Sequence, residues 1–114
     1  MNAPAVQPLS ADVSVSAQLE PSAMAWAAQA GYKSVINNRP DHEGGPDQPT
    51  SAQIEAAARA AGLAYAHLPV EPAVQTQEQI AAFAKLLAEM PHPILAFCRS
   101  GARSGKLFRA ATGG

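Results

Sequence analysis

The sequence has one cysteine, few aromatic residues and no long apolar run. Cys98 is the single cysteine in 114 residues, so no disulfide can form within the chain, and aromatic residues make up only 5%. No apolar segment approaches the ~20 residues that a membrane-spanning helix needs. The histidines have no metal-ligand spacing, and one cysteine cannot complete a zinc site. We therefore expect no metal, no cofactor and no contact with a membrane.

Charge is also scarce, and it is unevenly distributed. The formal net charge of −1 argues against a nucleic-acid-binding protein. No acidic residue follows Glu89, whereas this last part of the chain holds half of the eight lysines and arginines: Arg99, Arg103, Lys106 and Arg109. The local positive charge suits a small anion better than a long polyanion. The start, Met1–Pro4, lacks the charged and apolar parts of a signal peptide, and we expect a cytoplasmic protein.

The length predicts a single domain. Residues 1–11 are rich in proline and small side chains, and we expect a flexible lead-in, followed by one domain over residues 12–114. Val13 and Val15 alternate with serines, which is typical of a half-buried edge strand. Further strands are predicted at 32–36, 63–70 and 94–97, and helices at 21–30, 50–61, from 76 and from 103. Capping-box spacing marks two of the helix starts, at Thr50 and Thr76.

This alternation of strands and helices predicts an α/β fold with a mostly parallel central sheet of four to five strands and helices on both faces. In such sheets, ligands bind beyond the carboxyl ends of the strands. Cys98 follows the most apolar predicted strand, and a polar loop over residues 37–49 follows another. The sequence therefore predicts a site at Cys98, with this loop as a wall.

Cys98 opens the segment Cys98–Ser104, which combines a nucleophile, a glycine and two arginines. A strand, a turn and a helix start would place free backbone N–H groups around the sulfur, and neighbouring arginines can lower a thiol pKa. We expect Cys98 to be a reactive thiolate. The alternative is a small buried hydrophobic residue, which is the commoner role of free cysteine.

The residues after Cys98 would form an anion-binding loop. Arg103 is the expected catalytic clamp, because a planar guanidinium can contact two oxygens of one anion. Gly101 suits a left-handed or close-approach backbone. The other members are predicted to steer anions, to donate hydrogen bonds or to cap the helix: Arg99, Ser100, Ala102 and Ser104.

Two motifs, Asn37-Asn38-Arg39-Pro40-Asp41 and Cys98-Arg99-Ser100-Gly101-Ala102-Arg103-Ser104, occur together with His67-Leu68-Pro69-Val70. Over residues 12–110 the chain resembles the phosphatase-like domain of the beta-lactamase hydrolase-like proteins. The resemblance implies the fold of cysteine-dependent tyrosine and dual-specificity phosphatases. It also implies a link to persulfide dioxygenases, one of which is a possible partner, so both phosphoryl and sulfur chemistry remain open.

The chain departs from the phosphatase pattern in three ways. Four residues, not five, separate Cys98 from Arg103, and Phe97 replaces the histidine that precedes the phosphatase cysteine. A phosphatase also needs an acid to protonate its leaving alkoxide. Glu71 and the more remote Asp41 are the candidates, and neither fits well. Asn38, Arg39 and Asp41 are expected to frame the pocket, with Arg39 and Asp41 possible partners of each other.

Sulfur transfer requires no such acid, because sulfite and thiolates are good leaving groups. The loop length also resembles the sulfur-carrying loop of rhodaneses, an unrelated fold. The sequence favours an enzyme that takes sulfur from thiosulfate or a low-molecular-weight persulfide onto Cys98 and passes it to a thiol such as glutathione. The alternatives are a phosphate monoester hydrolase with a cysteinyl-phosphate, and a non-catalytic anion-binding, persulfide-binding or docking domain.

Overall fold

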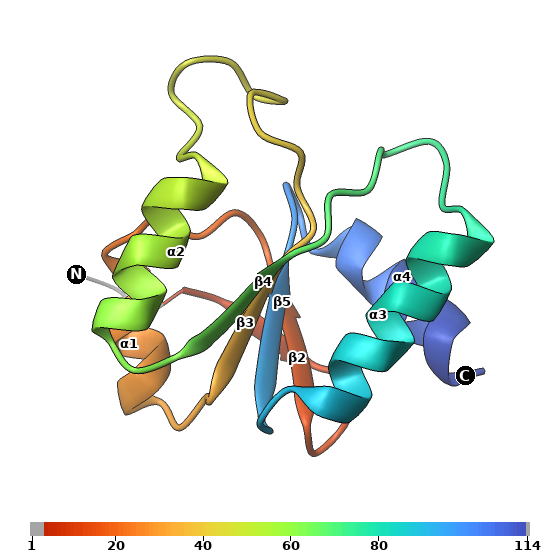
Figure 1. Ribbon diagram of the computed structural model, residues 1–114, viewed down its shortest axis with the longest axis horizontal. Helices are drawn as coiled ribbons and strands as arrows, with labels where there is room; N and C mark the ends of the chain where they lie inside the picture. The colour runs from red at the N-terminus through yellow and green to blue at the C-terminus, as the bar shows by residue number, and fades with distance from the viewer. Residues whose placement is uncertain (1–3, 114) are drawn as a thin grey trace.

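A five-stranded sheet lies between two pairs of helices in the computed structural model, which describes residues 4–113 (Figure 1). The strands are β1 (Val6–Pro8), β2 (Val13–Ser16), β3 (Ser34–Asn37), β4 (Ala64–His67) and β5 (Ile94–Phe97). The helices are α1 (Ala23–Gln29), α2 (Ser51–Ala60), α3 (Gln77–Glu89) and α4 (Ala102–Thr112). Helices α1 and α2 cover one face of the sheet, and α3 and α4 cover the other. None of the described helices is long and apolar enough to span a membrane.

The strand order is β1-β2-β5-β3-β4, with β5 at the centre. Strand β5 pairs in parallel with β2 and β3, β4 pairs in parallel with β3, and β1 pairs antiparallel with β2. The predicted α/β class, the mostly parallel sheet and the helices on both faces are confirmed.

The start of the chain differs from the sequence prediction. Strand β1 lies inside the segment 1–11 that we expected to lack regular structure, while residues 1–3 of that segment fall outside the described part. Because β1 covers the outer side of β2, β2 is an interior strand, and all four of its residues are buried. The serines of β2 misled the prediction, since their alternation with valine is typical of a strand with one exposed face.

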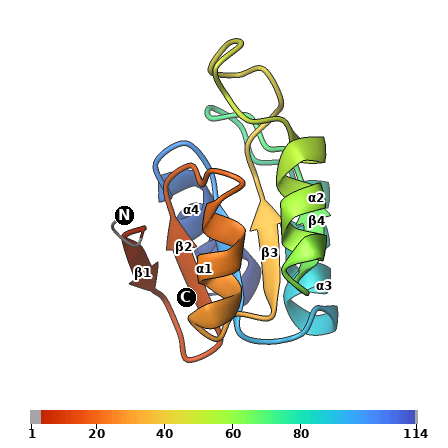
Figure 2. The same ribbon diagram turned by 90° about the vertical axis from the view of Figure 1, so that its left-hand side faces the viewer.

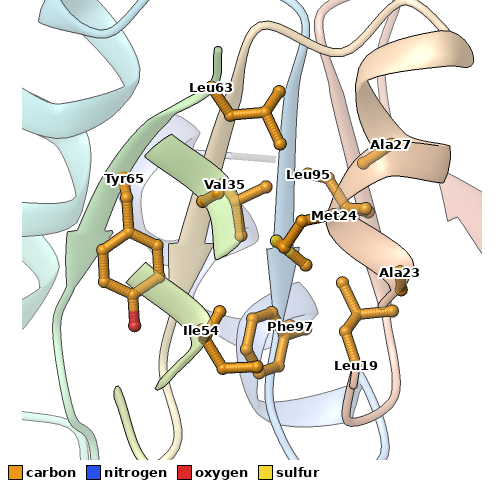
Figure 3. Packing of buried hydrophobic residues seen from close by; sticks show 11 residues of the cluster. Leu19, Ala23, Met24, Ala27, Val35, Ile54, Leu63, Tyr65, Leu95 and Phe97 are labelled. Atoms are coloured by element: carbon orange, nitrogen blue, oxygen red, sulfur yellow. The ribbon is translucent and has the colours of Figure 1, made fainter. Parts of the chain in front are cut away.

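Alternating side chains along the central strands form two apolar cores, one on each face of the sheet. Val35, Leu95 and Phe97 face α1 and α2, where they pack with Met24 and Ile54 (Figure 3). The next residues along the strands face α3 and α4 and form the second cluster with two helical side chains: Ile36, Ile94, Ala96, Phe83 and Leu107. Strands β3 and β5 are therefore buried on both sides, as parallel central strands usually are.

Two helices begin with complete capping boxes. The Thr50 hydroxyl accepts a hydrogen bond from Gln53 N–H at 3.2 Å, and Gln53 Oε1 accepts one from Thr50 N–H at 2.9 Å. Thr76 and Gln79 repeat this arrangement at the start of α3. The boxes satisfy N–H groups that have no partner within the helix, and they confirm the predicted starts of both helices.

Two loops extend beyond the carboxyl ends of β3 and β4, at the same end of the sheet (Figures 1 and 2). One connects β3 to α2 and the other connects β4 to α3. Backbone hydrogen bonds fix the end of the sheet: Asn38 N–H donates to Phe97 O at 2.8 Å, and Leu68 N–H donates to Asn37 O at 2.9 Å. The turn from β5 to α4 is thus held close to the roots of both loops.

Candidate active site

Cys98 directly follows β5 and is only 1% exposed. Gly101 N–H donates a hydrogen bond to Cys98 Sγ over 3.1 Å. Gly101 has φ +94°, and a Cβ atom there would lie 3.2 Å from the carbonyl carbon and oxygen of Ser16. A side chain would therefore be strained in conformation and crowded against β2. Gly101 meets both conditions that the sequence analysis expected of it, and it directs its N–H group toward the sulfur.

The thiol of Cys98 is easier to ionise than an ordinary cysteine. Burial by itself raises the pKa of this thiol, but hydrogen bonding from the loop that follows outweighs burial and lowers the pKa below its usual value. Ser104, through its N–H and hydroxyl groups, contributes to this lowering of the pKa, and so do the N–H groups of Ser100 and Gly101. The direction agrees with the sequence expectation, but the cause is different, because hydrogen bonds and not arginine charges produce it.

Ser104 and Asn38 link the first turn of α4 to the end of β3. Both side chains are fully buried, and the Ser104 hydroxyl donates to Asn38 Oδ1 at 2.8 Å. Asn38 Nδ2 donates to Leu68 O at 3.1 Å, which fixes the orientation of the amide. Asn38 therefore lies directly behind the loop that holds Cys98 and does not form a wall of an open pocket.

Arg103, the predicted anion clamp, is bound by Glu43. Nη1 and Nη2 of Arg103 donate to Glu43 Oε2 and Oε1 at 3.0 and 3.2 Å, and Nη1 also donates to Val70 O at 3.0 Å. The Nε–H group and the second hydrogen of Nη2 have no protein partner within residues 4–113. One edge of the guanidinium is thus anchored, while the other edge remains available for an anion.

Arg39 binds the same carboxylate. Its Nε donates to Glu43 Oε1 at 2.9 Å, and its Nη1 donates to Gln18 Oε1 at 3.1 Å. Burial alone raises the pKa of Glu43, but hydrogen bonds and charge from Arg103 and Arg39 hold that pKa below its usual value. Glu43 is therefore a carboxylate at neutral pH, and it offers no proton to a neighbouring group.

The loop that carries Glu43 is tied to itself. Gln48 Nε2 donates to Pro40 O at 2.9 Å, and Gln48 Oε1 accepts from Gly44 N–H at 2.6 Å. A Cβ atom at Gly44 would lie 2.7 Å from Arg39 Nη2, so a side chain there would force that guanidinium to shift. These contacts hold Glu43 between the two arginines.

A cavity of about 480 Å³ lies over this ion-pair cluster. It is lined by residues of both loops and of the turn after β5: Arg39, Glu43, Gly44, Pro72, Arg99 and Arg103. Three of these six side chains are cationic and one is anionic. The cavity is thus suited to an anion. Arg39, Glu43 and Gly44 of the loop 37–49 form part of its wall, as the sequence analysis expected of this loop.

Both proposed acids, Asp41 and Glu71, lie outside the lining of this cavity. Asp41 Oδ1 accepts a hydrogen bond from Ser51 N–H at 2.7 Å, at the start of α2, and the expected pairing of Arg39 with Asp41 is wrong because Arg39 pairs with Glu43. Glu71 is exposed, and its neighbour Pro72 lines the cavity in its place. Phe97 packs in the core beside α1 and has no polar group with which to orient the loop (Figure 3).

The remaining loop residues lie at the surface. Arg99 lines the cavity and is exposed, and its carbonyl oxygen accepts from Gln18 N–H at 3.2 Å. Ser100 Oγ accepts from Ala102 N–H at 3.3 Å, within the turn that leads into α4. Across the described part of the chain, no cluster of three or more His, Cys, Asp or Glu residues has the arrangement of a metal site.

Sequence reasoning missed Glu43, Gln18 and Gln48. The only local signal for Glu43 is its position four residues after Arg39, a spacing that carries meaning in helices but not in a loop. Its second partner, Arg103, is 60 residues away. The acids considered from the sequence were those between Val70 and Cys98, together with Asp41, so Glu43 was not among them.

Comparison with known proteins gives a consistent family and fold. The family profile described as "Beta-lactamase hydrolase-like protein, phosphatase-like domain" matches residues 6–114. A beta-lactamase hydrolase-like protein of Agrobacterium fabrum is 42% identical over 78 residues, which make up 68% of this chain and 18% of that protein. The chain therefore spans about a fifth of the length of this relative.

Solved structures share the same fold. A candidate phosphatase from Neisseria meningitidis has a TM-score of 0.83 and 33% identity, over 90% of this chain and 72% of that one. The core catalytic domain of the PP-IP phosphatase SIW14 from S. cerevisiae has a TM-score of 0.69 and 13% identity, over 90% and 60%. The similarity to the yeast phosphatase domain shows only that the two proteins share a fold.

Proposed function

Because the chain belongs to the family of phosphatase-like domains of beta-lactamase hydrolase-like proteins, we propose a function within that fold: sulfur transfer through Cys98. In this proposal, Cys98 is the nucleophile and Arg103 is the anion clamp. The donor is thiosulfate or a low-molecular-weight persulfide, and the acceptor is a thiol such as glutathione. A cytoplasmic location would supply such thiols, and a persulfide dioxygenase would be a partner that consumes the product.

The observation that carries the proposal is the position of Glu43, whose carboxylate contacts the guanidinium groups of both Arg103 and Arg39. Among the described residues, Glu43 is the one carboxylate that contacts Arg103, and two guanidinium groups hold it in the charged form. A phosphate ester with an alkoxide leaving group needs a proton donor, and this carboxylate has no proton to give. Sulfite and thiolates leave without one.

In the first step, the Cys98 thiolate attacks the outer sulfur of the donor. A Cys98–sulfur bond forms, the donor S–S bond breaks, and sulfite or a thiolate leaves with the electron pair. The Nε–Nη2 edge of Arg103 is available to bind the oxygens of thiosulfate. In the second step, the acceptor thiolate attacks the outer sulfur of the persulfide, and Cys98 leaves as the thiolate. No outside oxidant or reductant is required.

Phosphate ester hydrolysis is the second candidate. It is favoured by the fold that the chain shares with the phosphatase candidate from Neisseria meningitidis and the yeast phosphatase domain. The same loop and Arg103 would bind a phosphate ester, which is also a small tetrahedral anion. An aryl ester would react without an acid, because an aryloxide is a better leaving group than an alkoxide. A third candidate is binding or docking without turnover, which the 1% exposure of Cys98 favours.

The test is to incubate the protein with thiosulfate, with glutathione persulfide and with an aryl phosphate in parallel. Intact mass reports covalent loading, and sulfite and phosphate release report turnover, with Cys98→Ala as the control. We expect the gain of one sulfur atom with release of sulfite or glutathione, and no gain in Cys98→Ala. Cysteine-dependent phosphate release without sulfur loading would establish the hydrolase. The absence of both reactions would favour the binding module.

A further inference from the structure

The buried guanidinium group of Arg39 is only partly used by the protein. The side chain is 10% exposed, its Nε–H donates to Glu43, and one N–H of Nη1 donates to Gln18. Within residues 4–113, Nη2 donates to no acceptor. Charged donors without a partner are unfavourable when they are buried, so Nη2 is suited to an acceptor that enters from solvent.

Nη2 of Arg39 lies at the cavity, beside Gly44. Both residues line the cavity, and a Cβ atom at Gly44 would lie 2.7 Å from Nη2. Because Gly44 has no side chain, this part of the wall leaves Nη2 uncovered. Arg103 is a neighbour, since Glu43 Oε1 accepts from Arg39 Nε at 2.9 Å and from Arg103 Nη2 at 3.2 Å. Two guanidinium groups with unused N–H groups therefore line the same cavity.

The cavity is larger than a small inorganic anion requires. Its volume of about 480 Å³ is within the range of roughly 300–1,000 Å³ that is typical of sites for organic ligands. Pro72 adds apolar surface to a lining that otherwise consists of three arginines, one glutamate and one glycine. Cys98 is not among the lining residues, so the cavity can hold a part of the substrate that does not react. The lining thus suits an organic molecule with an anionic group away from its reactive atom.

We propose that Arg39 is a specificity-determining residue whose Nη2 binds a carboxylate of the sulfur donor. A carboxylate suits this group because guanidinium and carboxylate form short, charge-assisted hydrogen bonds. This role rests on the proposed sulfur transfer and names the class of its donor, an organic persulfide that carries a carboxylate. In this arrangement Arg39 holds a group that does not react, Pro72 contacts the carbon skeleton, and Arg103 remains the clamp for the reacting end.

The test uses two donors that differ only in the carboxylate, the persulfides of mercaptopropionic acid and of its amide. Loading of Cys98 by intact mass and release of the thiol give kcat/KM for each donor. The unaltered chain should prefer the acid about tenfold. Arg39→Lys should lose most of this preference, because an ammonium group lacks the second edge of the guanidinium fork. Arg59→Lys, on the exposed surface of α2, is the control and should keep the preference.

Gly44→Ala separates the position of Nη2 from its charge. This variant keeps every charged residue, but its methyl group would lie 2.7 Å from Nη2 and would force the guanidinium to shift. We expect the preference for the acid to fall several-fold in Gly44→Ala, and this variant decides the matter if Arg39→Lys does not fold, as judged by circular dichroism. An undiminished preference for the acid in the folded variants would overturn the role of Arg39.

A binding measurement distinguishes this role from the sulfur chemistry. The S-methyl thioethers of the same acid and amide cannot donate sulfur, and NMR titration gives their Kd values. We expect the acid to bind the unaltered chain about tenfold more tightly than the amide, and Arg39→Lys and Gly44→Ala to reduce this difference. Tighter binding of the acid without any loading of Cys98 would refute the sulfur transfer and keep the carboxylate site. Equal binding of acid and amide would refute the carboxylate site, whether or not sulfur is loaded.

Discussion

Glu43 and Arg103 form a two-bond ion pair at 3.0 and 3.2 Å, although 60 residues separate them in the sequence. The pair joins the loop after β3 to the first turn of α4, and Arg39 adds a second cation. The side chains of Arg39, Arg103 and Glu43 are 10%, 9% and 19% exposed. This cluster fixes the orientation of the Arg103 guanidinium in the first turn of α4.

Replacing Glu43 by glutamine should destabilise the protein by about 1–3 kcal/mol, because two largely buried guanidinium groups lose their carboxylate. The loss should depend on pH. The folded-state pKa of Glu43 is depressed, so its stabilisation is fully present above the ordinary pKa of glutamate and is lost as the pH falls through the lower folded value. Urea unfolding at a series of pH values measures the difference between the two proteins.

Glu55→Gln is the matched control for that measurement. Glu55 pairs with Arg59 on the surface of α2, with side chains 45% and 58% exposed. Such a pair contributes only about 0.3–0.5 kcal/mol, so Glu55→Gln should change stability little at any pH. Equal effects of the two substitutions would contradict the structural role of Glu43.

Arg103→Lys should slow covalent loading of Cys98 by about 10–100-fold, because an ammonium group cannot hold Glu43 and an anion with the two edges of one planar fork. Stopped-flow measurement of sulfite release from thiosulfate gives the rate. Arg59→Lys, on the exposed surface of α2, is the control and should react at the unaltered rate. An unchanged rate in Arg103→Lys would remove this residue from the site.

Gly101→Ala should destabilise the protein more than Gly31→Ala. Both glycines have positive φ, +94° and +102°, so each substitution has a backbone cost of about 1–2 kcal/mol. Only at Gly101 does the new methyl group meet Ser16, at 3.2 Å, whereas nothing lies within 4 Å at Gly31. The added crowding should cost about 1 kcal/mol or more. Thermal and urea unfolding of both variants measure the difference, and similar losses would mean that β2 moves aside easily.

The stability of the protein should rise with pH in a way that depends on Cys98. The folded-state pKa of this thiol is lowered, so its contribution is fully present above the pKa of an ordinary thiol and is lost as the pH falls through the folded value. Urea unfolding under reducing conditions should therefore show a larger rise for the unaltered chain than for Cys98→Ser up to about pH 8.5. Parallel pH profiles would indicate that the thiol is not ionised in the fold.

Local patterns were sufficient to predict most of the fold. The threonine–glutamine spacing predicted the starts of α2 and α3, and the apolar run before Cys98 predicted the central strand, because caps and burial leave traces within a few residues. The sequence signal for strand β1 was weaker. Its three residues pair only with β2, and Pro8 within it is typical of a loop or an edge.

The sequence predicted two separate segments of the candidate site, the residues after Cys98 and the loop 37–49, but not the contacts that join them. The segment from Cys98 to Ser104 contains the sulfur and the groups that donate to it, so its chemistry could be read directly. Glu43 and Asn38 act through partners 60 and 66 residues away. Such contacts arise from the strand order that places β3 beside β5, and no local spacing encodes them.

Strand β1 also affects how the molecule meets its neighbours. The sheet ends on this side in a strand of three residues, and Pro8 has no N–H group to offer a further strand. A short edge that contains proline is a poor template for pairing with another chain, whereas the four residues of β2 would form a longer edge without β1. The chain thus protects this side of its sheet against intermolecular strand addition and aggregation.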